Sequence, residues 1–226
     1  MNLIVPEGVE LAGGVSPADW VVERLWPWRS GQIQVGSVMP EGFDAYVRIQ
    51  HEPGPLEDAE GSLPREQLIG LRAALEPFTN TPDQSWFCVW AGYGMLTGGT
   101  LLVAEPRGRI GRWWAHRRAR READRRAARE AELLAAVPQV RAENRQYFLF
   151  RGPLGTAELE FDGWYQSPNL WWPDDRAWCV ATEIDLSWTY VGGSRECIDR
   201  IMATPQLKAR EVVLQDPLVD RPLGRV

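Results

Sequence analysis

Apolar and polar positions alternate with the period of a strand in several parts of the chain. Residues 43–51 place Ala45, Val47 and Ile49 on one face and polar or aromatic residues on the other, as a half-buried strand does. Residues 86–91 are a continuous apolar run of strand length, which favours a buried central strand. The same reasoning predicts further strands over 32–35, 101–104, 145–151, 157–162, 177–186 and 188–191.

Helical spacing is confined to three segments. Leu68, Leu71 and Leu75 recur at helical intervals and predict a helix over 63–75. Ser194 is a good N-cap for a second helix that ends near Met202. The longest predicted helix covers about 109–137, where Ala, Arg, Glu and Leu dominate and Pro is absent.

Strands and helices do not alternate strictly, so the pattern predicts an α+β fold with a largely antiparallel sheet and a few flanking helices. The length of 226 residues suits a single domain over 1–226, with 107–138 as a projecting helical insertion. The Gly-Pro-Leu-Gly sequence at 152–155 predicts a hairpin between the strands on either side of it. Residues 167–175, rich in Pro and Trp, are expected to form a loop.

Composition narrows the class of protein. The formal net charge of −6 argues against general attraction to nucleic acid. No apolar run approaches the roughly 20 residues that cross a bilayer, and no secretory signal is visible. Cys88, Cys179 and Cys197 lack paired spacing and are expected to be reduced, buried thiols, so we expect a cytoplasmic protein.

The long predicted helix is unusually basic. Between residues 107 and 137 there are ten arginines against four acids. Four of the arginines recur every four residues and form one stripe: Arg117, Arg121, Arg125 and Arg129. The stripe is either a solvated face or a contact for an acidic partner, such as another copy of the chain, and this second use would make the protein a homo-oligomer. Nucleic acid is the less favoured partner because the rest of the chain carries a charge of −12, which repels a polyanion.

The usual chemical motifs are missing. Only His51 and His116 are present, neither in a His/Cys cluster, so no metal site is predicted. The glycines at 92–99 have the wrong spacing for a dinucleotide loop, and no P-loop exists, so no cofactor is predicted. Cys88 and His51 would form a dyad only if two distant strands aligned them, and a core thiol is the favoured interpretation of Cys88.

The densest group of aromatic and acidic residues lies at 167–194. Glu183 and Asp185 fall on one face of the predicted strand and could act as an acid/base pair, near further loop residues. The candidate binding residues are Trp171, Trp172, Asp174, Asp175, Arg176, Glu183 and Asp185, joined by Gly192, Gly193 and Ser194, whose backbone N–H groups could meet an anion. The structural alternative is that an aspartate caps a turn, Arg176 pairs with Glu183 or Asp185, and the tryptophans fill the core.

Several motifs together resemble a family of uncharacterised proteins from high-GC Gram-positive (actinobacterial) bacteria. They are M-P-E-G-F-D-A-Y-V-R-I-Q-H-E-P at 39–53, W-F-C-V-W-A-G-Y-G at 86–94, R-Q-Y-F-L-F-R-G-P-L at 145–154, the W-W-P-D-D-R segment within 167–185, and T-Y-V-G-G-S at 189–194. The resemblance implies no activity, ligand or functional residue.

The sequence supports three hypotheses of function. The first is a non-enzymatic cytoplasmic protein that binds another protein through a Trp-rich acidic surface at the candidate binding residues, because aromatic anchors beside charges suit an interface. The second is a hydrolase or transferase that uses Glu183 or Asp185 as its base. The third is binding of nucleic acid or an acidic partner through the Arg-rich helix.

Overall fold

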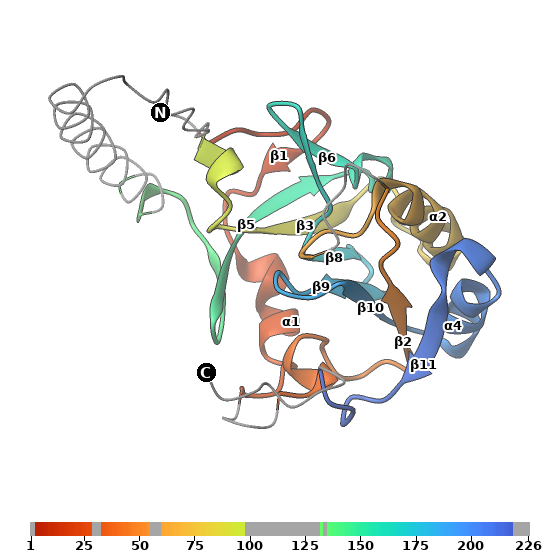
Figure 1. Ribbon diagram of the computed structural model, residues 1–226. Coiled ribbons are helices and arrows are strands. Elements are labelled where there is room, and N and C mark those ends of the chain that lie inside the picture. Colours follow the sequence, from red (N-terminus) through yellow and green to blue (C-terminus); the bar gives the residue numbers. More distant parts are fainter. Residues whose placement is uncertain (1–2, 29–32, 55–59, 98–131, 133–134, 219–226) are drawn as a thin grey trace, which may run out of the picture.

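One antiparallel sheet organises the chain. The computed structural model describes residues 3–28, 33–54, 60–97, 132 and 135–218. In this part of the chain nine strands form a single sheet in the order β1-β5-β3-β8-β9-β10-β2-β11, with β4 paired to β5 (Figure 1). A separate two-stranded hairpin joins β6 and β7. The predicted α+β class with a largely antiparallel sheet is therefore confirmed.

The strands are short, and most lie far from their sheet neighbours in sequence. Their bounds are β1 Glu10–Leu11, β2 Ala45–Gln50, β3 Ser85–Trp90, β4 Val140–Ala142, β5 Arg145–Gly152, β6 Leu159–Phe161, β7 Trp164–Gln166, β8 Leu170–Pro173, β9 Cys179–Thr182, β10 Trp188–Gly193 and β11 Ala209–Val212. The helices are α1 Asp19–Val22, α2 Arg65–Leu75 and α4 Arg195–Met202.

Both faces of the sheet are covered. On one face Val180 and Trp178 pack in a cluster with Leu68 of α2 and Ile198 of α4. On the other face Cys179 and Ala181 pack with residues of the N-terminal segment around α1. The predicted alternation holds over residues 178–181, where each set of side chains meets a core rather than solvent, but the strand β9 ends at Thr182, so the predicted continuation to 186 is wrong.

Several predicted elements are confirmed. Residues 43–51 contain β2, the run 86–91 corresponds to β3, and the leucine spacing of 63–75 marks α2. Ser194 is the N-cap of α4, and its hydroxyl accepts a hydrogen bond from the Cys197 N–H at 3.2 Å. All three cysteines are buried free thiols, as predicted.

Three further local predictions are wrong. Residues 33–35, the described part of the strand predicted over 32–35, do not form a strand: Gln34 makes only an isolated bridge to Pro217, and Val35–Ser37 is a 3-10 turn. The predicted hairpin does not form: β5 pairs with β1, β3 and β4, whereas β6 pairs with β7. The predicted loop 167–175 contains β8, which lies between β3 and β9 and brings two tryptophans into the sheet.

Two predictions lie outside the described residues. These are the strand at 101–104 and, except for its last residues, the long Arg-rich helix, including Arg117, Arg121, Arg125 and Arg129. Among the described helices, none combines the length and apolarity that crossing a bilayer requires.

Candidate functional site

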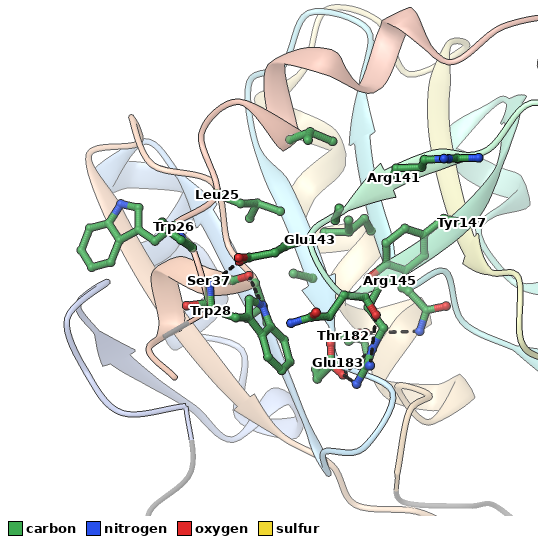
Figure 2. A pocket seen from close by; sticks show the side chains of 18 residues that line it. Leu25, Trp26, Trp28, Ser37, Arg141, Glu143, Arg145, Tyr147, Thr182 and Glu183 are labelled. Carbon is green, nitrogen blue, oxygen red and sulfur yellow. Dashed lines mark hydrogen bonds and ion pairs between the residues drawn. The ribbon is translucent and has the colours of Figure 1, made fainter. Parts of the chain in front are cut away.

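A pocket of about 380 Å³ opens on the face of the sheet that carries the N-terminal segment. Its size falls within the range of small-ligand sites, roughly 300–1,000 Å³. Figure 2 shows the side chains that line it. They are Val22, Leu25, Trp26, Pro27, Trp28, Ser37, Val38, Arg141, Ala142, Glu143, Asn144, Arg145, Tyr147, Asn169, Leu170, Ala181, Thr182 and Glu183.

Two walls of the pocket come from distant parts of the sequence. One wall runs from the last residue of α1, Val22, to Trp28, and the other is the β4–β5 hairpin. Only two residues, Glu143 and Asn144, connect Ala142 to its cross-strand partner Arg145. This tight turn holds the charged side chains at the hairpin end beside the pocket.

Trp28 joins the two walls. Its indole N–H donates to the Ser37 carbonyl at 3.2 Å, and its backbone N–H donates to a carboxylate oxygen of Glu143. The Arg145 guanidinium carbon lies 5.5 Å from the centroid of the Trp28 ring, within the range of a cation–π contact. The aromatic wall is therefore fixed at three points (Figure 2).

An ion cluster lies on one side of the pocket. Arg145 donates to Glu183 Oε1 through Nε at 3.1 Å and through Nη2 at 2.6 Å, and Nη2 also reaches Asp185 Oδ2 at 2.9 Å. The Glu183 side chain is only 5% exposed, whereas that of Asp185 is 75% exposed. Burial raises the pKa of Glu183, and the neighbouring Arg145 offsets part of that increase.

Tyr147 contributes a buried phenol to the pocket lining. It is 5% exposed, and burial followed by the nearby Glu183 charge raises its pKa well above the ordinary value. The hydroxyl is therefore protonated at neutral pH. The hydroxyl makes no hydrogen bond to another described residue, and it is not among the buried polar atoms that lack a partner, so it is a donor available to a molecule in the pocket.

Asn169 fixes the floor of the pocket. Its side-chain oxygen accepts from the Trp90 N–H at 2.8 Å, and its amide nitrogen donates to the Thr182 carbonyl at 3.2 Å. Tyr93 donates its hydroxyl to the Gly61 carbonyl at 3.1 Å and lies 3.3 Å from the Asn169 amide. Gly61 has a φ of +75°, where a side chain would also collide with the Ile184 carbonyl, so this position requires glycine.

Trp171 and Trp172 do not line a surface. Each is 1% exposed, because β8 is an interior strand and the sheet is covered on both faces. Trp171 packs edge-on against Trp178 with ring centroids 5.2 Å apart. The prediction that these two indoles form a recognition surface is therefore wrong, and the alternative that they fill the core is confirmed.

The loop acids have structural partners. Asp174 accepts the indole N–H of Trp86 at 2.9 Å. Asp175 accepts from the Thr79 hydroxyl at 2.9 Å and from the Asn80 N–H at 2.7 Å. Arg176 is exposed and stacks on Trp20; it does not pair with Glu183 or Asp185, whose partner is Arg145. Asp175 therefore braces the loop before β3, Asp174 holds Trp86 at the start of β3, and neither aspartate lines the pocket.

The glycines near the end of the candidate segment are part of the sheet. Gly192 and Gly193 belong to β10 and pair with Tyr46 and Ala45, so the strand predicted over 188–191 continues through both glycines. A Cβ on Gly192 would lie 2.6 Å from the Phe43 ring, which explains the glycine. Both residues are buried, and Ser194 uses its side chain to cap α4. We find no support for an anion site there.

The other chemical candidates are separated. His51 follows β2, whereas Cys88 lies in β3, and β8, β9 and β10 intervene in the sheet. His51 Nε2 instead lies 2.9 Å from the Thr189 hydroxyl. Among the described residues, no group of three or more His, Cys, Asp or Glu side chains is arranged to hold a metal ion.

The structure brings Glu183 and Asp185 together on Arg145, although both follow β9 and do not share the face of a strand, and of the two only Glu183 lines the pocket. Residues that the sequence pattern did not single out complete the site. These are Arg145, Tyr147, Trp28 and Asn169. Arg145 is the first residue of a predicted strand and follows Asn144, a residue type typical of turns. This combination could have indicated that Arg145 lies at the end of a hairpin. No local pattern distinguishes Trp28 among the 12 tryptophans of the chain.

Comparison of the chain with protein-family models, with curated proteins and with solved structures gives no match in any of the three. The resemblance to the actinobacterial family therefore stays a prediction, and the function must be argued from the pocket itself.

Proposed function

We propose that this chain is a non-enzymatic binding protein and that the pocket in Figure 2 receives a side chain or short segment of a protein partner. The recognition surface moves from the buried Trp171 and Trp172 to the pocket beside Trp28 and Glu183. Aromatic walls with a few fixed polar groups are typical of sites that recognise a partner. The predicted cytoplasmic location belongs to the same proposal.

The single observation that carries the proposal is the Tyr147 hydroxyl. The hydroxyl faces the open pocket, so a ligand acceptor would take this hydrogen bond in place of water, for a net gain of roughly 0.5–1.5 kcal/mol. The neighbouring Arg145 is already held by Glu183 and by the Trp28 ring, which makes the surroundings preorganised.

Filling the pocket is the direct test. Peptides selected from a random display library on the wild-type protein would be titrated against Ala142→Phe, whose new ring occupies the cavity, and against Tyr147→Phe. We expect Ala142→Phe to weaken binding by at least about tenfold and Tyr147→Phe by about fivefold, the latter from loss of one hydrogen bond. Fluorescence polarisation of labelled peptides measures both.

Ala203→Phe is the matched control, because it adds the same ring at an exposed position outside the pocket. The affinity of this variant for the selected peptides should equal that of the wild type. Selected peptides that bind Ala142→Phe as tightly as the wild type would place recognition elsewhere and refute the proposal.

Acid/base catalysis at Glu183 is the second candidate function. The observation in its favour is a buried carboxyl of raised pKa beside an open pocket, a combination that is frequent in active sites. Against it, Arg145 holds one Glu183 oxygen with two donors. If this candidate is correct, a panel of nitrophenyl esters, glycosides and phosphates should reveal a turnover that falls at least about a hundredfold in Glu183→Gln. Turnover unaffected by that substitution would eliminate it.

The Arg-rich helix stays a prediction as a contact for an acidic partner, a second copy or nucleic acid, because its stripe lies outside the described residues.

A further inference from the structure

Trp20 in α1 forms a rigid aromatic platform away from the pocket. It is 6% exposed, and its ring makes edge contacts with Trp172 at 5.8 Å and with Phe43 at 6.3 Å between centroids. Neither Trp20 nor the arginines beside it line the pocket of the proposed function. A ligand bound at Trp20, Arg24 and Arg176 would therefore contact residues other than those that line that pocket.

Two exposed arginines converge on this indole from separate parts of the chain. The guanidinium carbon of Arg24 lies 5.6 Å from the Trp20 ring centroid, and that of Arg176 lies 5.4 Å from it. Stacking on an aromatic ring leaves the N–H edge of a guanidinium group open to a carboxylate. Among the described residues, neither side chain makes a hydrogen bond or an ion pair.

The acids nearest in sequence to Arg176 have other partners. Asp174 accepts from Trp86, and Asp175 accepts from Thr79 and Asn80. Near Arg24, the Glu41 carboxylate accepts the indole N–H of Trp26 at 2.9 Å. Within the described part of the chain, neither guanidinium group therefore forms an ion pair with these acids, although the net charge of the protein is −6.

The backbone at Arg176 is unusual for an arginine that serves only as solvated surface. Arg176 has a φ of +58°, a left-handed conformation that disfavours side chains other than Gly, Asn and Asp. Arg24 lies over Gly42, where an added Cβ would be 3.2 Å from its Nη1. Strain kept at an exposed position favours a functional use of the side chain.

We propose that Arg24 and Arg176, held on Trp20, bind an acidic peptide segment of a partner protein. Each guanidinium group takes one carboxylate in a two-pronged hydrogen bond, so the ligand needs two acidic side chains rather than a single ion. A short acidic segment fits a local basic pair, whereas a long nucleic acid would meet the repulsion of the remaining acidic surface.

The probe is a fluorescein-labelled peptide of alternating glutamate and serine, compared with the same peptide carrying glutamine in place of every glutamate. Wild-type protein should bind the glutamate peptide and lose affinity as salt rises. The double variant Arg24→Gln/Arg176→Asn should bind about tenfold more weakly. Asn tolerates the left-handed backbone at 176, so this variant should keep its fold, which circular dichroism and thermal melting would verify.

Arg195→Gln/Arg200→Gln removes two exposed positive charges from α4 and is the charge-matched control. It should bind as the wild type does. Equal binding by the Trp20-site double variant and the wild type would overturn the proposal, as would equal binding of the glutamine peptide. Tighter binding of a short single-stranded oligonucleotide, abolished by the double variant, would also overturn it by assigning the site to nucleic acid.

Discussion

Trp171→Ala is expected to lower the free energy of unfolding by about 3–5 kcal/mol, the cost of truncating a large aromatic residue in a core. Trp171 is 1% exposed in β8, between β3 and β9, and contacts Trp178 and Phe87. Removal of its ring leaves a cavity at the centre of the sheet, where the neighbouring strands cannot collapse freely. Urea denaturation followed by tryptophan fluorescence and circular dichroism measures the change.

Trp164→Ala is the matched control. Trp164 begins β7 in the small hairpin and is 59% exposed, so the same truncation there should change the unfolding free energy by less than about 0.5 kcal/mol. A Trp171→Ala protein with wild-type stability that has lost a partner would restore the surface role that the sequence pattern predicts for this residue.

The confirmed elements are those in which a local preference and the tertiary fold agree. Ser194 precedes α4 and supplies its cap, and the leucines of α2 face a single core cluster. The run at 86–91 is apolar throughout because β3 lies inside the sheet with both faces covered. In these cases the sequence spacing and the packing carry the same information.

The segment at 167–175 shows where local reasoning is wrong. Pro173 and the adjacent aspartates are typical of a loop, and exposed tryptophans are typical of interfaces, so the sequence pattern favoured a surface. Pairing of β8 with β3 and β9 depends on residues about 80 positions upstream, such as Trp86, which lies opposite Trp172. Local preferences contain no information about that pairing.

The pocket was predictable only in part, because it too depends on contacts between residues far apart in the sequence. Glu183 and Asp185 were identified because they share one face of a predicted strand. Their partner Arg145 comes from β5, and the aromatic wall comes from Trp28, more than one hundred residues before it. Only the sheet order, in which β3 and β8 separate β5 from β9, defines the space that these side chains enclose.

Arg145→Met is expected to lower the free energy of unfolding by an amount that depends on pH, and this is the second large effect. The substitution removes both donors from Glu183 Oε1 and leaves a buried carboxylate without its counter-charge. Breaking a buried ion pair from one side costs about 3–5 kcal/mol. Because the Arg145 side chain is 20% exposed and the ion pair is therefore not fully buried, we expect the loss of stability to lie at the lower end of this range, about 3 kcal/mol at about pH 8.

The sign of the change in stability with pH follows from the pKa of Glu183. Burial already raises that pKa above the ordinary value, so the native state holds the proton more strongly than the unfolded chain does. The stability that Glu183 contributes is fully present below the ordinary carboxyl pKa and falls as pH rises through the raised native pKa. Loss of Arg145 raises the native pKa further, so the cost of the substitution should be small near pH 5 and reach its full size near pH 8.

Glu183→Gln added to Arg145→Met separates charge from packing. The double variant has no buried carboxylate at 183, so the pH-dependent part of the cost should disappear and most of the lost stability should return at about pH 8. Urea midpoints of the wild type, the single variant and the double variant at about pH 5 and about pH 8 test this. A cost of Arg145→Met that is equal at both pH values would show that its role is packing against Trp28 and not neutralisation of Glu183.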